Sequence, residues 1–131
     1  MDPQYLGLGD FLVIAARVLG VEAEVLARAT NLVVADSALN APAAVFGGQE
    51  FYPVFETKVA VLGYRLARNH PLLDGNKRVA LLAMVEFAER NGRQWRPFDE
   101  DDTVSTMEGV AAGTMSEDAF IQWVADALEP A

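Results

Sequence analysis

The sequence of 131 residues contains no cysteine and only one histidine, His70. The first absence excludes disulfides and thiolate metal sites, and the second excludes a histidine-rich metal centre. No stretch approaches the roughly 20 apolar residues of a membrane-spanning helix, and the N-terminus lacks the basic and then apolar pattern of a signal peptide. We therefore expect a soluble, cytoplasmic protein.

Positive charge is also scarce, because ten Lys and Arg residues stand against 19 Asp and Glu residues, and the net charge is −9. This balance argues against nonspecific binding of nucleic acid. Nine acidic residues and no basic one follow Arg96, so we expect the C-terminal third to present a solvated acidic face. Half of the basic residues fall between positions 58 and 78: Lys58, Arg65, Arg68, Lys77 and Arg78. One basic locality in an acidic body favours a small anion bound at a focused site.

Hydrophobic residues make up 52% of the chain, which is enough for a core, and the length suits one domain over residues 1–131. The spacing of apolar residues predicts helices over 8–20, 22–28, 30–40, 53–69, 75–91, 99–112 and 116–128. Residues 44–52 read instead as two short extended pieces around Gly47-Gly48, a pair that permits a tight hairpin. The predicted fold is all-α, a compact helical bundle with one small β-hairpin. This hairpin is either a connecting loop or a flap that accepts an extended peptide by strand addition.

The segment Asn69-His70-Pro71-Leu72-Leu73-Asp74-Gly75-Asn76-Lys77-Arg78 gathers most of the chemistry-bearing residues. An apolar run follows it, which places Lys77 and Arg78 in the first turn of a buried helix. A cation at that end of a helix costs about 0.3–1 kcal/mol, because the helix dipole there favours anions. A glycine before a helix N-terminus with basic side chains around it is typical of a phosphate pocket. The alternative is a structural histidine beside ordinary surface lysine and arginine.

Residues 70–78, His-Pro-Leu-Leu-Asp-Gly-Asn-Lys-Arg, resemble the signature of the Fic/Doc superfamily, whose wider pattern is HPFx[DE]GNGR. Leu72 takes the place of the usual phenylalanine. Lys77 takes the place of the second glycine, which marks the Doc (death-on-curing) branch of toxins from bacterial toxin–antitoxin modules. The resemblance covers roughly residues 5–128, and it includes a hairpin flap at 44–52 and an active-site loop and helix start at 70–78. It implies a Fic-type helical bundle.

The resemblance implies a role for each residue of the motif. His70 would be the general base that takes the proton from a target hydroxyl, and imidazole suits this task near neutral pH. Asp74 would hold Mg²⁺ on the phosphates of ATP. The remaining assignments are phosphate binding by Gly75, Asn76, Lys77 and Arg78, and binding of a target peptide at the flap by Phe46, Gly47 and Gly48.

Two departures from the wider pattern bear on the reaction. Fic nucleotidyl transferases have glycine at the position of Lys77 and a second arginine at the position of Leu81. Doc-type proteins share the lysine and lack that arginine, and the resemblance implies a reversed nucleotide that delivers its γ-phosphoryl group to a Ser or Thr hydroxyl. The target in this branch is translation elongation factor Tu, so translation would be arrested. The alternatives are transfer of AMP to a protein hydroxyl, and a binding module without catalysis.

Regulation is expected to come from another protein. Many Fic proteins carry an internal inhibitory motif, [ST]xxxE[GN], but Ser37 is followed four residues later by Ala41. The resemblance therefore implies a Phd-like antitoxin whose C-terminal segment folds into a groove on the toxin. Arg65 and Arg68 precede the motif, and they are either anchors for such a partner or for the nucleotide, or ordinary surface residues.

Overall fold

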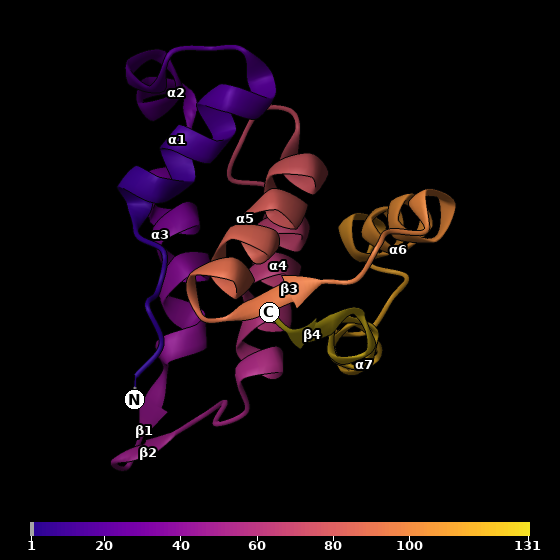
Figure 1. The fold of residues 1–131 in the computed structure, drawn as a ribbon. Helices are drawn as coiled ribbons and strands as arrows, with labels where there is room; N and C mark the ends of the chain where they lie inside the picture. The colour runs from indigo at the N-terminus through magenta and orange to yellow at the C-terminus, as the bar shows by residue number, and fades with distance from the viewer. Residues whose placement is uncertain (1) are drawn as a thin grey trace.

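The computed structural model describes residues 2–131, and two long antiparallel helices form its centre (Figure 1). They are α4 (Phe55–Asn69) and α5 (Asn76–Arg90). Apolar residues recur at helical spacing along both, so α4 buries Val59, Leu62 and Leu66, and α5 buries Val79 and Phe87. The two helices pack against each other along their length.

A glycine allows this close packing. Gly63 is buried in the middle of α4, and a Cβ atom at this position would overlap the Met84 side chain of α5. The helix therefore accepts the roughly 1 kcal/mol that an interior glycine costs relative to alanine. In return, the thioether of Met84 fills the space against the backbone of α4.

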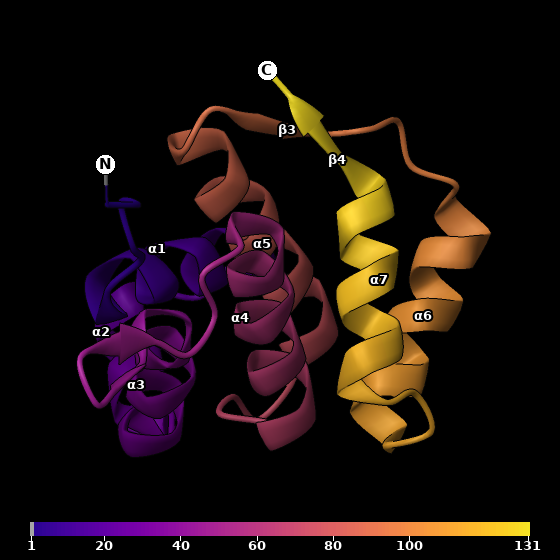
Figure 2. The same ribbon diagram turned by 90° about the horizontal axis from the view of Figure 1, so that it is seen from below.

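Five further helices flank this pair in two layers (Figure 2). One side carries α1 (Leu8–Leu19), α2 (Ala23–Ala29) and α3 (Leu32–Asn40), and the other carries α6 (Glu100–Ala112) and α7 (Glu117–Ala127). Three of the five have side-chain N-caps, in which Asn31, Asp99 and Ser116 accept a hydrogen bond from a backbone N–H of the first turn. The core of the molecule lies where both layers meet α4 and α5.

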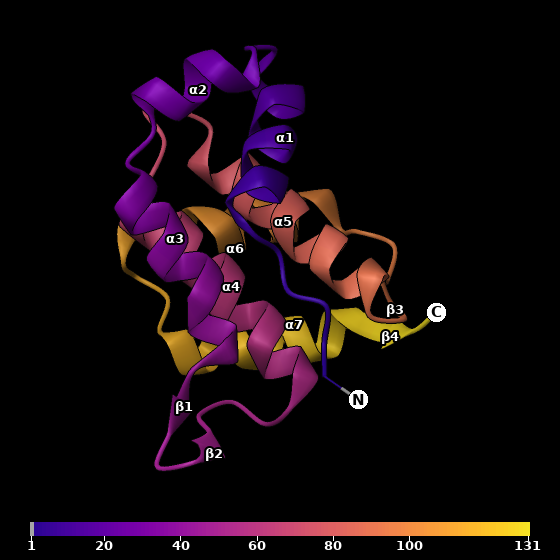
Figure 3. The ribbon, with the colours of Figure 1, turned by 90° about the vertical axis from the view of Figure 1, so that its left-hand side faces the viewer.

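The expected hairpin is present between α3 and α4. A 3₁₀ turn (Ala41–Ala43) leads into β1 (Val45–Phe46), which pairs antiparallel with β2 (Gln49–Glu50). Gly47 and Gly48 connect the strands with φ of 60° and 81°, as a two-residue turn with two positive φ angles requires. Figures 1 and 3 place this hairpin at the N-terminal end of α4, at the far end from the loop that joins α4 to α5.

A second antiparallel pair was not predicted. Strand β3 (Arg93–Trp95) pairs with β4 (Leu128–Pro130), with Trp95 opposite Leu128. The helix predicted to reach residue 128 therefore ends at Ala127, and the chain continues extended beside β3. Three-residue strands are too short to show a period-2 pattern, so the local sequence carries no signal for them.

The predicted all-α fold with a small hairpin is confirmed, and the seven predicted helices appear within two residues of the expected bounds. Among residues 2–131, no helix combines the length and the apolar character that a membrane span requires.

Candidate active site

The loop between α4 and α5 carries the motif, and its first residue has an unusual backbone. His70 caps the C-terminus of α4 with φ 50° and ψ 60°, and it is the one non-glycine residue with positive φ in the described part of the chain. This left-handed conformation is common for glycine at helix C-termini and costs an ordinary residue about 1–2 kcal/mol. His70 thus holds an exposed imidazole on a backbone conformation that most residues avoid.

Three hydrogen bonds hold the loop in place. The Asn76 side chain accepts from the Leu72 N–H and donates to the Leu72 C=O, both at 2.9 Å. The Asn31 N–H donates to the Pro71 C=O at 2.9 Å, which ties the loop to the start of α3. Pro71 and Leu72 are buried, so Leu72 fills the apolar position expected for it. The backbone on which His70 and Asp74 stand is therefore fixed from both sides.

Gly75 joins this loop to α5. It is the N-cap of α5 with φ 77°, and a Cβ atom there would overlap Cδ2 of Leu19 from α1. The first hydrogen bond of the helix runs from Val79 N–H to Gly75 C=O. The N–H groups of residues 76–78 precede it, and they are the unpaired donors that make a helix start attractive to anions.

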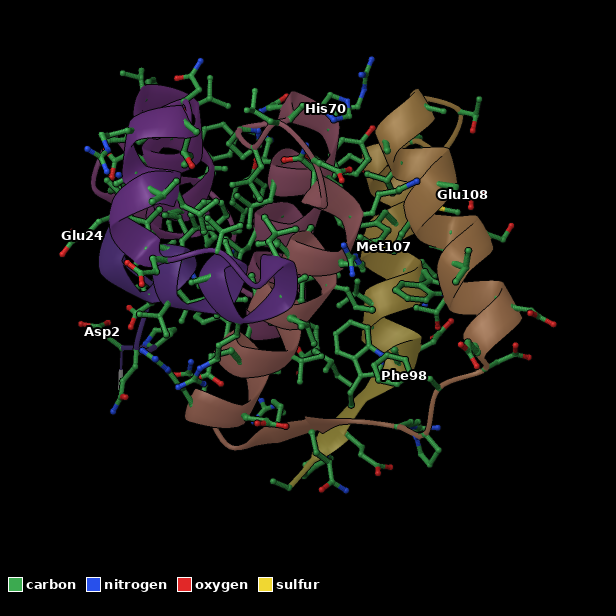
Figure 4. The ribbon with its side chains drawn as sticks, turned by 90° about the horizontal axis from the view of Figure 1, so that it is seen from above. Asp2, Glu24, His70, Phe98, Met107 and Glu108 are labelled. Atoms are coloured by element: carbon green, nitrogen blue, oxygen red, sulfur yellow. The ribbon has the colours of Figure 1, made fainter. Side chains whose placement is uncertain are left out.

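The two cations of the motif lie in this first turn, as predicted. Lys77 and Arg78 are exposed, and the guanidinium of Arg78 lies against Gly75, since Nη2 is 3.8 Å from the position a Cβ atom would occupy there. Together with Leu81 of the next turn they line a cavity of about 140 Å³ between α5 and α6. Met107 and Glu108 contribute to its opposite wall, and Figure 4 shows both on α6. Leu81 thus presents an apolar side chain beside the two cations.

Asp74 is exposed on the loop, and it makes no ion pair with any of residues 2–131. The described residues contain no group of three or more His, Asp and Glu side chains that could hold a metal ion. A single carboxylate suits Mg²⁺ only when phosphate oxygens and waters complete its coordination, as they do in nucleotide enzymes. Asp74 therefore fits the Mg²⁺ that the motif implies, provided that phosphate oxygens and waters supply the other ligands.

The two arginines that precede the motif have structural partners. Arg65 Nε lies 3.3 Å from a carboxylate oxygen of Glu117, and its Nη2 donates to the Tyr52 hydroxyl at 3.3 Å. Arg68 lies against Gly113, where Nη2 is 2.9 Å from the position of an ideal Cβ. Gly113 caps the C-terminus of α6, the end of a helix that favours a cation. Both arginines therefore have an explanation that requires no ligand.

The structure does not bring the hairpin beside the loop. Phe46 is 79% exposed at the hairpin, and α4, 15 residues and thus about 22 Å long, separates it from His70. A cavity of about 420 Å³ extends from Phe51 and Tyr52 next to the hairpin as far as Arg65. The predicted flap residues Phe46, Gly47 and Gly48 do not line this cavity, and neither does any residue of the motif.

Lys58 belongs to the basic locality in sequence but not in space. Only 2% of its side chain is exposed, and Nζ donates to the Pro42 C=O and to Glu50, both at 3.0 Å. Burial acts to lower the pKa of Lys58, but the interactions with Glu50 and Tyr5 outweigh it, and the pKa is raised above its ordinary value. Lys58 anchors the hairpin to α4 at the end remote from His70. Lys58 lies one turn before the buried Leu62, on the apolar face of α4, and this spacing could have indicated that Lys58 is buried.

Two contacts that hold the loop were not predicted from the sequence. The Asn76 amide was assigned to phosphate, and in the structure it holds the Leu72 backbone. The contact between Leu19 and Gly75 joins residues 56 positions apart, so no local pattern could indicate it. The assignment of Asn76 to phosphate stays a prediction.

Comparison with known proteins found a matching family and a similar toxin. Residues 6–88 match the Fic/DOC family, and this range includes the hairpin, the motif loop and most of α5. The chain is 38% identical to Toxin Doc of Mycolicibacterium smegmatis over 109 residues, which cover 82% of this chain and 81% of that protein.

Proposed function

The chain belongs to the Fic/Doc family, and we propose that it is a toxin of a toxin–antitoxin module that phosphorylates a protein. The reaction is transfer of the γ-phosphoryl group of ATP to a Ser or Thr hydroxyl. The toxin role is supported by the similarity to a protein named Toxin Doc over most of both chains. The enzymatic role is supported by the intact motif on a fixed loop at a helix start.

The observation that favours phosphoryl transfer over AMP transfer is the pair Lys77 and Leu81. A lysine side chain in the first turn of α5 occupies space that glycine leaves open in the nucleotidyl transferases of the family. Leu81 lines an apolar cavity where those enzymes have a second arginine, so it cannot hold a phosphate. A nucleotide bound in the reversed direction keeps its terminal phosphate beside Lys77 and Arg78.

The mechanism assigns one task to each group. His70 takes the proton of the target hydroxyl as its oxygen attacks the γ-phosphorus, and the bond from this phosphorus to the oxygen that bridges to the β-phosphate breaks, which releases ADP. The N–H groups at the start of α5, with Lys77 and Arg78, stabilise the charge on the phosphoryl oxygens. Asp74 would hold Mg²⁺, which neutralises phosphate charge when it is bound. Gly75 and Asn76 keep these groups in position, and phosphate binding by both residues remains part of the proposal.

The hairpin at Phe46, Gly47 and Gly48 is the proposed docking point for an extended segment of the target. Helix α4, which is about 22 Å long, lies between this hairpin and His70, and an extended chain rises about 3.3 Å per residue. The docked segment and the acceptor hydroxyl would then lie about seven residues apart in the target sequence. Translation elongation factor Tu is the proposed target, on the basis of the resemblance to the Doc branch.

A Phd-like antitoxin is the proposed inhibitor. No copy of the [ST]xxxE[GN] inhibitory motif is apparent in the sequence, so the chain offers no inhibitory helix of its own. An antitoxin segment that folds on the toxin would supply the inhibition from outside.

The deciding experiment incubates the purified protein with Mg²⁺, elongation factor Tu and ATP that is labelled at the γ- or the α-phosphate. We expect label on the factor from the γ position only. His70→Ala should reduce this transfer by about 100-fold or more, since it removes the base. Label from the α position would mean AMP transfer and would refute the interpretation of Lys77 and Leu81.

A double variant tests the same interpretation in the other direction. Lys77→Gly with Leu81→Arg restores the two residues of the nucleotidyl transferases, and we expect γ transfer to fall while α transfer rises. The single variant Leu81→Arg is the matched control for the added charge. If His70→Ala remained toxic on expression while folded, the protein would act through binding, not catalysis.

A further inference from the structure

A second cavity lies next to the one that Lys77 and Arg78 line, and Thr103 of α6 contributes to both. Three aromatic rings line a cavity of about 280 Å³ where β3 leads into α6 beside the end of α7. Trp95 lies with its ring centroid 5.9 Å from that of Phe98 and 5.8 Å from that of Trp123. Phe98 is 49% exposed, so one wall of this cavity is an aromatic face open to solvent. Figure 4 shows Phe98 on the side of α6 and α7, apart from His70.

Three carboxylates share the cavity with these rings: Asp99, Asp102 and Asp126. Asp99 and Asp102 stand at the start of α6, where the helix dipole favours negative charge, so their position alone requires no ligand. One oxygen of Asp102 accepts from the Trp123 indole at 2.9 Å, which fixes this carboxylate against the aromatic wall.

Asp126 has no such explanation. It lies in the last turn of α7, where the helix dipole disfavours a negative charge. Its hydrogen-bond donor is the neutral side chain of Gln122, at 3.0 Å. No ion pair within residues 2–131 involves any of the three carboxylates of the cavity. The cavity therefore concentrates uncompensated negative charge on an aromatic surface.

The cation that lines this cavity is engaged elsewhere. Arg96 contributes to the lining, but its Nε lies 3.5 Å from Glu129 on β4. The cation–π contacts of the described residues are Lys58 over Tyr5 and Arg93 over Phe55, neither of which belongs to the cavity. The rings at this site have no cation over them.

We propose that the cavity is a docking site for an arginine side chain on a basic segment of a partner protein. A guanidinium stacks on tryptophan and phenylalanine faces and at the same time donates to carboxylates, and the cavity offers both. Lysine has no planar group to stack. Charge complementarity extends beyond the cavity, because the chain carries no basic residue after Arg96 and a net charge of −9. The proposal does not rest on the proposed reaction, since the cavity contains no residue of the motif, although Thr103 also lines the cavity beside Lys77 and Arg78.

The chain provides its own reporter, because its two tryptophans both line this cavity. Intrinsic tryptophan fluorescence is titrated with a short capped peptide of alternating arginine and glycine, and with the same peptide in which citrulline replaces arginine. Citrulline keeps the planar shape and loses the charge. We expect a saturable change with the arginine peptide and at least about tenfold weaker binding of the citrulline peptide. Salt is kept at about 0.15 M, where the Debye length is about 8 Å, to screen distant charges.

Two variants locate the site. Asp126→Asn and Phe98→Ala should each weaken binding by about three- to tenfold. The matched control is Asp118→Asn, which removes the same charge at the other end of α7 and should change affinity by less than about twofold. Phe98 is half exposed and Asp126 is on the surface, so both variants should fold, which circular dichroism checks.

Three results would overturn the proposal. Equal binding of the citrulline peptide would exclude recognition of the charge. An equal loss in Asp118→Asn would mean diffuse attraction to an acidic surface. If the arginine peptide did not bind and Asp126→Asn instead abolished a dimer seen by ultracentrifugation, the occupant would be a second copy of this chain.

Discussion

Gly75 is the position at which one added methyl group should do most damage to the motif. In Gly75→Ala, the backbone would keep φ 77°, which costs alanine about 1–2 kcal/mol relative to glycine. The new methyl group would also overlap Cδ2 of Leu19, and overpacking of this kind costs about 1–3 kcal/mol. The sum is about 2–5 kcal/mol, against a total stability of about 5–15 kcal/mol for a typical domain.

Gly20→Ala separates the two contributions. Gly20 has φ 66° and no heavy atom within 4 Å of an ideal Cβ, so alanine there should cost the backbone part alone. Urea unfolding of both variants should therefore show a loss at position 75 that is larger by about 1–3 kcal/mol. Adding Leu19→Ala to Gly75→Ala should relieve the overlap, so the two changes together should cost less than the sum of their separate losses.

Two results would refute this reasoning. Equal losses at positions 20 and 75 would mean that the loop relaxes away from α1. Strict additivity of Leu19→Ala and Gly75→Ala would mean that the two side chains do not compete for space. Phosphoryl transfer by Gly75→Ala should fall further than its stability explains, because the methyl group lies against the guanidinium of Arg78.

Three further predictions concern other positions. His70→Gly and His70→Ala should both lack transfer activity. The glycine variant should be more stable to urea by about 1 kcal/mol, because the backbone of residue 70 is in the left-handed conformation. Equal stability of the two variants would contradict this backbone conformation. Gly63→Ala should lower the unfolding free energy by up to about 2 kcal/mol, because overlap with Met84 costs about 1–3 kcal/mol and replacing an interior glycine recovers about 1 kcal/mol; strict additivity of Gly63→Ala and Met84→Ala would argue against the contact. The hydrogen bond from the Gly7 amide and the pair with Arg90 hold the pKa of Asp10 below its ordinary value, so its contribution to stability is present near neutral pH and lost in acid as the pH falls through the lowered pKa. Asp10→Asn should accordingly lose less stability than the parent between pH 6 and pH 3, and an identical loss would exclude this carboxylate as a source.

The five basic residues between positions 58 and 78 do not form one cluster in the fold. Lys58 is buried at the hairpin end of α4, Arg65 pairs with Glu117, and Arg68 lies at the end of α6. The free cations beside the start of α5 are Lys77 and Arg78, within the residues that the structure describes. The anion site is therefore smaller and more local than the count of basic residues between positions 58 and 78 indicates.

The helices, the hairpin and the motif could be predicted because each depends on residues that are neighbours in the sequence. Apolar spacing of 3.6 identifies the helices, Gly47-Gly48 identifies the turn, and His70 to Arg78 are contiguous. The family could be inferred for the same reason, since its signature is a continuous segment.

Contacts between residues that are far apart in the sequence are visible only in the tertiary structure. Strands β3 and β4 pair residues 33 to 37 positions apart, Leu19 closes over Gly75, and the aromatic cavity joins Trp95 to Trp123. The Asn76 amide turned inward because two backbone groups of Leu72 lie within its reach. Such contacts arise from packing between elements, and packing depends on the shapes of distant side chains, which no local pattern records.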